Sequence, residues 1–258
     1  MRFIDVHCHL DGGVYGDLNT LFERLTAAGV EKVICAGFDI PSSEFAAGLS
    51  EKFPSCYYTA GFHPTELKKY REGDLEIIAE LARGEKCVAI GEIGLDYHYP
   101  DTDKPLQRHI FAGQLRLAHE LGLPVQIHSR DSAEDTLGVL KEFGGLLSNG
   151  ALLHCFSYSP EIALEMQKLG ACFSFGGTST YSGSKRAKKS IAAVGADRLL
   201  TETDSPYLAP LSRRGEFPNT PESIPEICAN MAHIRGVTVE EMAETVWQNA
   251  HNLFKKLR

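Results

Sequence analysis

The sequence lacks several features that would each assign it to a class of protein. No apolar run approaches the roughly 20 residues that a helix needs to cross a bilayer, and no apolar leader follows Met1 and Arg2. The seven cysteines form no CxxC pair and lie mostly within apolar runs, a pattern typical of reduced, buried thiols. We therefore expect no membrane span, no disulfide framework and a cytoplasmic location.

Positive charge and tryptophan are also scarce. The formal net charge is -8, which disfavours a broad nucleic-acid surface because such a surface is normally basic. Trp247 is the only tryptophan and falls in a predicted terminal helix, so the sequence shows no aromatic groove for stacking bases. Any polyanionic substrate must be held locally, and bound cations would concentrate positive charge at that site.

Eight short apolar runs recur along the chain, with room between them for a turn and a returning helix. A length of 258 residues suits a (β/α)8 barrel, which needs about 250. An open doubly wound sheet would favour a GxGxxG motif after the first run, and this motif is absent. No linker divides the chain. We predict an α/β fold in which residues 1–258 form a single-domain (β/α)8 TIM barrel. The runs are 2–7, 32–38, 57–62, 87–92, 124–128, 151–155, 171–176 and 198–203.

Six residues able to bind metal lie at or just past the ends of these runs. His7 and His9 are separated by one residue, so alternation along a strand turns both imidazoles to the same face. A barrel brings the carboxyl ends of all its strands to one mouth, where distant ligands can meet. The six residues are His7, His9, Glu92, His128, His154 and Asp204.

Each of these residues also has an ordinary structural explanation. A single histidine closing an apolar run is more often a hydrogen-bonded core residue, Glu92 could form an ion pair, and Asp204 could serve a turn. All six explanations would have to hold together to remove the site, so we favour two divalent cations. Imidazole and carboxylate ligands suit Zn, Mn or Ni, and Mg where carboxylate and water dominate.

Two further residues are predicted at the same mouth. His63 follows the third run, and we expect it to contact the substrate or its leaving group, the alternative being a turn histidine. Arg130 could bind a substrate phosphate through its fork, unless it pairs with Asp131 or with solvent.

Three other charged features belong to the last two repeats. Glu202 has the strand parity of Asp204 and is expected to face the barrel interior, where it can orient a ligand. The basic runs Lys185–Lys189 and Arg213–Arg214 indicate solvated surface, or loops that guide a phosphodiester strand.

Motifs that carry these residues follow one another from residue 3 to residue 254. They are Phe3–Leu10, Gly61–Pro64, Gly91–Tyr97, Ile127–Arg130, His154–Ser157, Glu202–Leu208, Arg214–Gly215 with Asn219 and Pro221, and Asn249 with Leu253–Phe254. Together they resemble the TatD family of metal-dependent deoxyribonucleases, which are amidohydrolase-like TIM barrels. The resemblance implies that the six ligands hold two divalent metals, with Glu92 bridging them, and that the substrate is DNA, single-stranded or accessible at an end.

Our hypothesis is that a hydroxide shared by two ions attacks the phosphodiester, with Asp204, Glu92 and His63 as catalytic residues and Arg130 as a second substrate contact. We expect a monomer. One alternative is an amidohydrolase-type enzyme that acts on a small amide, ester or phosphoester. Another is a non-catalytic nucleic-acid-binding barrel, against which the complete ligand set argues.

Overall fold

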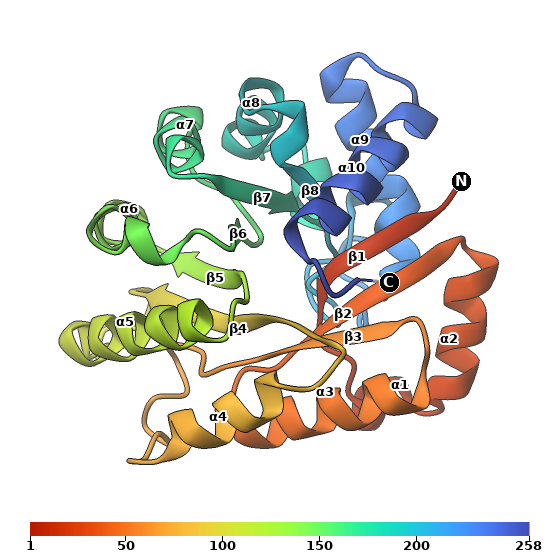
Figure 1. The fold of residues 1–258 in the computed structure, drawn as a ribbon. Helices are drawn as coiled ribbons and strands as arrows, with labels where there is room; N and C mark the ends of the chain where they lie inside the picture. The colour runs from red at the N-terminus through yellow and green to blue at the C-terminus, as the bar shows by residue number, and fades with distance from the viewer. Residues whose placement is uncertain (258) are drawn as a thin grey trace.

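Eight parallel strands follow one another around a barrel in chain order, with helices outside it (Figure 1). The computed structural model describes residues 1–257. Each strand pairs in parallel with the next one along the chain, so the predicted (β/α)8 TIM-barrel fold is confirmed. The strands are β1 (Phe3–Cys8), β2 (Val30–Ala36), β3 (Cys56–Ala60), β4 (Cys87–Asp96), β5 (Val125–Arg130), β6 (Ala151–Leu153), β7 (Ala171–Phe175) and β8 (Leu199–Thr201).

The last strand is joined to the first one mainly through bonds near the mouth. The backbone N–H of Asp204 donates to the carbonyl of His7 at 3.0 Å, and that of His9 donates to the carbonyl of Ser205 at 2.6 Å. Below them, the buried Asp5 carboxylate accepts the N–H of Thr203 at 3.0 Å. The chain segments that carry three predicted ligands are therefore fastened directly to one another.

Helices connect the strands, and local sequence signals set their ends. The Asp17 side chain accepts from two N–H groups of the first turn of α2, and Gly29, at φ 76°, follows that helix. The helices are α1 (Gly12–Tyr15), α2 (Leu18–Ala27), α3 (Ile40–Lys52), α4 (Asp74–Ala82), α5 (Lys104–Glu120), α6 (Ala133–Glu142), α7 (Pro160–Lys168), α8 (Lys185–Ala193), α9 (Ile224–Arg235) and α10 (Val239–Leu253). Short 3₁₀ turns are η1 (Gly144–Leu146), η2 (Gly177–Thr180), η3 (Ala196–Arg198), η4 (Leu211–Arg213) and η5 (Pro221–Ser223). No helix within residues 1–257 is both long and apolar enough to cross a membrane.

Strands β4 and β5 extend beyond the runs from which they were predicted. Glu92 and His128 therefore lie inside strands, and the expectation that they close them is wrong. The strands continue because Gly94 pairs with His128 in the β4–β5 ladder, and a Cβ on Gly94 would lie 2.0 Å from the carbonyl oxygen of His128. Glycine thus permits the close approach that brings both residues to the mouth.

Candidate metal centre

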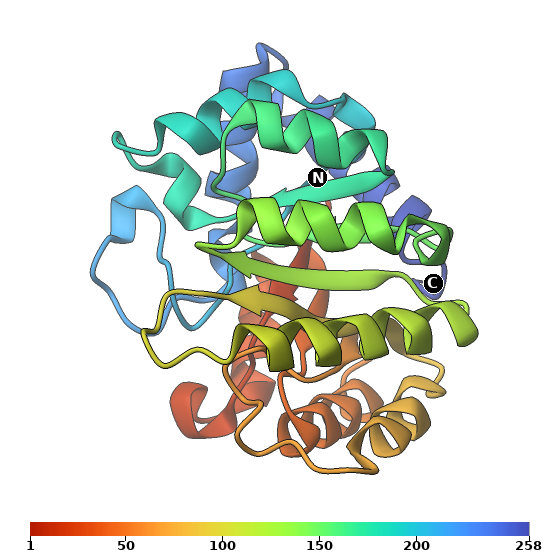
Figure 2. The same ribbon diagram turned by 90° about the vertical axis from the view of Figure 1, so that its left-hand side faces the viewer.

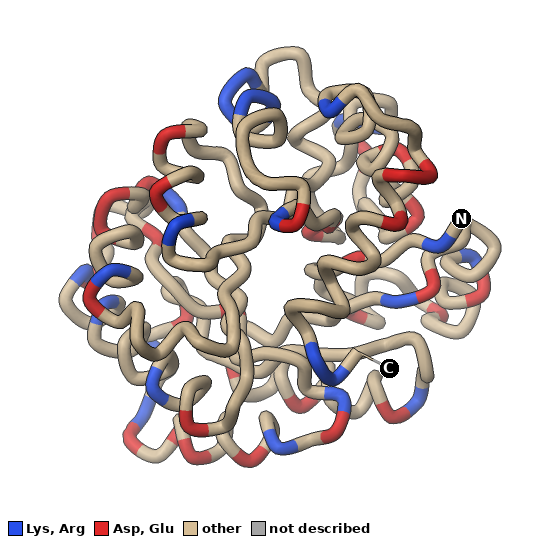
Figure 3. Tube along the Cα trace, turned by 45° about the horizontal axis from the view of Figure 1, so that its top comes forward, with Lys and Arg blue, Asp and Glu red and all other residues tan. Residues whose placement is uncertain are grey.

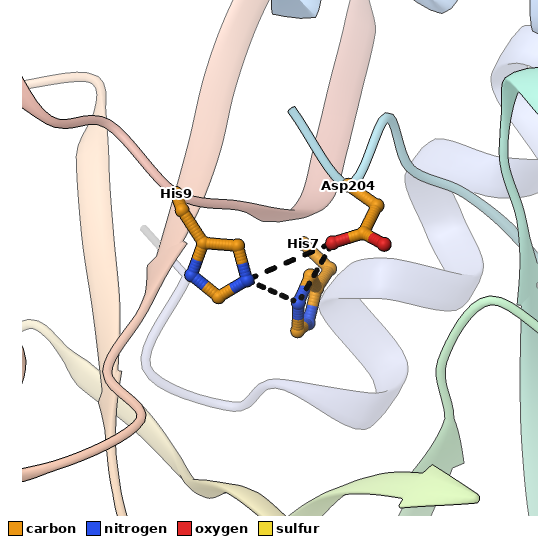
Figure 4. A group of neighbouring side chains, drawn as sticks. All are labelled: His7, His9 and Asp204. Atoms are coloured by element: carbon orange, nitrogen blue, oxygen red, sulfur yellow. Dashed lines mark hydrogen bonds and ion pairs between the residues drawn. The ribbon is translucent and has the colours of Figure 1, made fainter. Parts of the chain in front are cut away.

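The first group of predicted ligands comes from the neighbouring ends of β1 and β8. The Nε2 atoms of His7 and His9 lie 3.2 Å apart, and each lies within 3.7 Å of the Asp204 Oδ1 atom. Figure 4 shows the two rings and the carboxylate converging on a common point. We call these three residues the β1 group.

Glu92 stands between this group and a second one. Its Oε2 atom lies 3.6 Å from Nε2 of both His7 and His9. Its Oε1 atom lies 3.0 Å from Nδ1 of His128 and 2.8 Å from Nε2 of His154, which we call the β5–β6 group. The two oxygens of one buried carboxylate therefore face two separate sets of imidazoles, an arrangement suited to a ligand shared by two cations.

Hydrogen bonds assign the tautomers of the β1 histidines. Gln126 donates its Nε2 to the carbonyl of Val6, so its Oε1 is left to accept from His7 Nδ1 at 2.7 Å. His9 Nδ1 donates to the carbonyl of Ala36 at 3.0 Å. Both rings then carry their proton on Nδ1, and the inward-facing Nε2 atoms offer lone pairs to a metal.

Carboxylates stand behind the β5–β6 histidines instead. His128 Nε2 lies 3.0 Å from Asp96 Oδ2, so Nδ1 is the nitrogen that faces the centre. His154 Nδ1 and Glu202 Oε1 lie 3.8 Å apart, and both are buried without a hydrogen-bond partner among the described residues. A small rotation would join them and leave Nε2 of His154 free to bind metal. Glu202 faces the barrel interior, as its strand parity predicts.

The carboxylates have strongly altered acidities. Burial raises the pKa of Glu92, but the surrounding imidazoles of His63, His154 and His7 outweigh it and hold that pKa well below its usual range. For Asp204, burial raises the pKa to about 7, with Glu202 and Glu92 contributing in the same direction although His154 opposes them. Glu92 is therefore an anion at neutral pH, whereas Asp204 becomes one fully only when a cation offsets its burial.

Sequence and structure comparisons place the chain among known proteins. The model of the family described as "TatD related DNase" matches residues 4–255. The chain belongs to the TatD-related DNase family. It is 39% identical to the uncharacterized metal-dependent hydrolase YabD of Bacillus subtilis, with 97% of this chain and 98% of the relative covered.

Two other relatives carry further information. Identity to the 3'-5' ssDNA/RNA exonuclease TatD of Citrobacter rodentium is 34%, covering 92% of each chain. The crystal structure of YjjV, a TatD homologue from Escherichia coli K12, superposes with a TM-score of 0.93 at 32% identity, covering 98% of each chain. This TatD-family chain is accordingly a metal-dependent hydrolase, and the described residues offer clusters that can hold the metal.

His63 also reaches the centre, but with the opposite tautomer. Its Nδ1 accepts the backbone N–H of Thr65 at 3.2 Å and also contacts the Thr65 hydroxyl at 2.7 Å. Burial lowers the pKa of His63, so the ring is neutral and carries its proton on Nε2, 3.3 Å from Glu92 Oε1. A protonated Nε2 has no lone pair for a metal but can donate a hydrogen bond.

Arg130 lies at the rim of the same cavity, which has a volume of about 440 Å³ and is lined by His63, Glu92 and Asp204 among others. Its side chain is exposed and forms no ion pair within residues 1–257, so pairing with Asp131 is not observed. Asp131 instead faces His98 Nδ1 at 3.2 Å.

Three residues that sequence reasoning does not single out support the ligands from behind: Asp5, Asp96 and Gln126. All three are buried, and each accepts a hydrogen bond from a predicted ligand or holds its strand. Strand parity carries a signal for them, since each lies an even number of residues from a ligand in its own strand.

Proposed function

We propose that this TatD-family chain hydrolyses phosphodiester bonds of DNA with two divalent cations. The observation that carries the proposal is the position of Glu92, whose two carboxylate oxygens face the inward nitrogens of two separate groups of imidazoles. The nuclease names of the relatives in Citrobacter rodentium and zebrafish support the choice of substrate.

Each cation would have its own set of ligands. The β1 group would hold one and the β5–β6 group the other, with Glu92 shared between them. The mixed imidazole and carboxylate donors fit Zn, Mn or Ni, and Mg less well. When bound, such ions acidify a coordinated water and neutralise charge on a phosphoryl oxygen.

Three residues of the chain would transfer protons and bind the substrate. Asp204 would orient the attacking water and accept its proton, since its carboxylate becomes an anion when a cation offsets its burial. His63 would donate its Nε2 proton to the leaving oxygen or to the phosphate. Arg130, exposed at the rim, would bind a neighbouring phosphate through its fork.

The deciding experiment compares the wild type with Asp204→Asn on end-labelled single-stranded DNA. The variant keeps the shape of the side chain but loses its charge, so we expect at least about a 10²-fold loss of metal-stimulated cleavage. Unchanged turnover would remove Asp204 from the mechanism. Parallel assays on aryl phosphoesters, amides and carboxylic esters test an amidohydrolase-type activity, and failure to bind metal at all would revive the non-catalytic barrel.

The lengths of the end-labelled DNA fragments also show whether cleavage begins at the 3′ or the 5′ end.

We further propose that the whole chain acts as one catalytic domain, as a monomer in the cytoplasm, on single-stranded or end-accessible DNA. Size-exclusion chromatography with light scattering checks the monomer.

A further inference from the structure

Two loops at the mouth are joined into one surface beside the metal centre. The segment after β7 and the long loop after β8 run side by side in Figure 2, in teal and light blue. The N–H of Leu211 donates to the Thr180 hydroxyl at 2.7 Å, and the Tyr181 hydroxyl donates to the carbonyl of Ala209 at 2.6 Å.

Two aromatic rings stand exposed on the loop after β8. Tyr207 is 58% exposed and Phe217 is 64% exposed, with ring centroids 6.1 Å apart. Tyr207 lines the cavity of the metal centre, and its N–H donates to the carbonyl of Asp204 at 3.0 Å. Apolar rings exposed at the edge of a site lower their free energy when a flat partner covers them.

A single buried asparagine holds this loop in shape. Asn219 donates its Nδ2 to the carbonyl of Tyr207 at 2.8 Å, and its backbone N–H donates to the carbonyl of Pro206 at 2.8 Å. Its own Oδ1 accepts from the Ser223 hydroxyl. The two rings are thus presented by a loop whose ends are tied together, which reduces the entropy lost when a ligand binds.

Cations lie on both of the joined segments. The first turn of α8 carries Lys185 and Arg186 and no acidic residue, and neither cation has an ion pair within residues 1–257. Figure 3 shows the basic residues of this part of the chain as a blue run at the top of the view. Arg214, on the loop after β8, stacks over the ring of Tyr181 at 4.7 Å, so a third cation lies where this loop meets the segment before α8. Positive side chains are unfavourable at a helix N-terminus unless an anion joins them.

The other side of the mouth has the opposite character. There Lys68 pairs with Asp101 at 2.8 Å, and Lys69 pairs with both Glu66 and Asp39. Lys68 and Lys69 are thus already paired with carboxylates, so a polyanion gains little from these two cations.

We propose that a single-stranded polynucleotide leaves the metal centre over the surface formed by Tyr207, Phe217, Arg214, Lys185 and Arg186, which we call the basic-aromatic wing. Its bases stack on Tyr207 and Phe217, and its phosphates lie beside the three cations. The inference rests on the proposed nuclease function and assigns the course of the strand. A duplex cannot use this wing in the same way because its base faces are already stacked.

The first test measures hydrolysis of a twelve-residue thymidine oligonucleotide and of bis(p-nitrophenyl) phosphate, which extends little beyond the scissile bond. Phe217→Ala should raise KM for the oligonucleotide at least about fivefold, the lower end for removal of one base stack, with kcat unchanged. KM for the small diester should stay the same. Phe217→Trp should restore the low KM, and Phe45→Ala, which removes an exposed ring on α3, serves as the inert control.

The second test concerns the phosphates. The double variant Lys185→Ala/Arg186→Ala should reduce the slope of log KM against log salt by about 0.7 for each phosphate that the variant no longer binds. The matched variant Lys68→Ala/Lys69→Ala removes two cations from the other side of the mouth and should leave the slope unchanged.

Fluorescence anisotropy with the same oligonucleotide, without added metal, separates this inference from the proposed function. Weaker binding by Phe217→Ala, with Phe45→Ala unaffected, supports the wing even if no DNA is cleaved. If the wild type cleaves DNA but Phe217→Ala binds and cleaves it with wild-type constants, the wing is wrong and the nuclease stands. The wing is also wrong if Lys68→Ala/Lys69→Ala changes the salt dependence of KM more than Lys185→Ala/Arg186→Ala does.

Discussion

The two groups of the metal centre differ in what stands behind their histidines. In the β1 group, His7 and His9 donate to an amide and a backbone carbonyl, both neutral acceptors. In the β5–β6 group, His128 and His154 face the carboxylates of Asp96 and Glu202.

The acidities follow this difference. Burial lowers the pKa of His7 and of His9. Burial also acts to lower the pKa of His128 and His154, but the adjacent carboxylates, including Glu92, outweigh it and raise both. An imidazole backed by a carboxylate is the more basic ligand, so we expect the β5–β6 group to hold its cation more tightly than the β1 group.

The largest expected effect comes from removing the residue that the two groups share. Glu92→Gln keeps the shape but loses the anion on which both groups converge, so we expect at least about a 10³-fold loss of activity, since bound metal supplies several kcal/mol of transition-state stabilisation. Metal content, measured by mass spectrometry after dialysis, should fall at both positions. Retention of two ions per chain would show that the groups are independent.

His63 tests whether every histidine at the centre is a ligand. Because its lone pair is used by Thr65, His63→Gln should lower kcat by about 10²-fold to 10⁴-fold, the range for a missing proton donor, and leave metal content unchanged. Release of an ion from this variant would place His63 in the β5–β6 group instead.

Asp96 tests the carboxylate backing itself. Asp96→Asn should weaken metal affinity at the tighter position by about 10-fold to 100-fold, the usual effect of removing such a support, and bring the two positions closer in affinity. Asp131→Asn makes the same change on an exposed neighbour and should have no effect. Isothermal titration of metal into both variants measures the affinities. If Asp96→Asn binds metal as tightly as Asp131→Asn does, the carboxylate behind His128 does not strengthen metal binding.

The smallest effect is a pH dependence of metal binding at the β1 group. Asp204 has its pKa raised to about 7, so below that pH the carboxyl holds a proton that the cation must displace. Affinity should then fall by about tenfold per pH unit as pH drops below 7, and it should level off above it. The same raised pKa means that ionising Asp204 costs more free energy in the metal-free folded chain than in the unfolded chain. The metal-free fold therefore loses stability as pH rises from the ordinary pKa of an aspartate toward 7. Metal should therefore raise Tm more at pH 8 than at pH 6, and thermal unfolding at both values checks the sign.

Strand alternation and barrel topology account for most of what is predictable about the site. They identify the shared face of His7 and His9 correctly because a strand has a period of two wherever its neighbours are. They fail at the ends of β4 and β5, where Gly94 allows a close approach that depends on the partner strand. Asp96 shares the strand parity of Glu92, but it lies in the part of β4 that this pairing extends, beyond the apolar run 87–92.

The order of the strands, the candidate ligands and the family can all be read along the chain, because they depend on local periodicity and on short motifs. Which nitrogen of each histidine faces the metal is decided only by the folded barrel, since hydrogen-bond partners such as Gln126 and Ala36 come from other strands. Folding also brings the rings of Tyr207 and Phe217 together, although the sequence shows no aromatic groove. Ring contacts across a folded loop leave no period in the sequence.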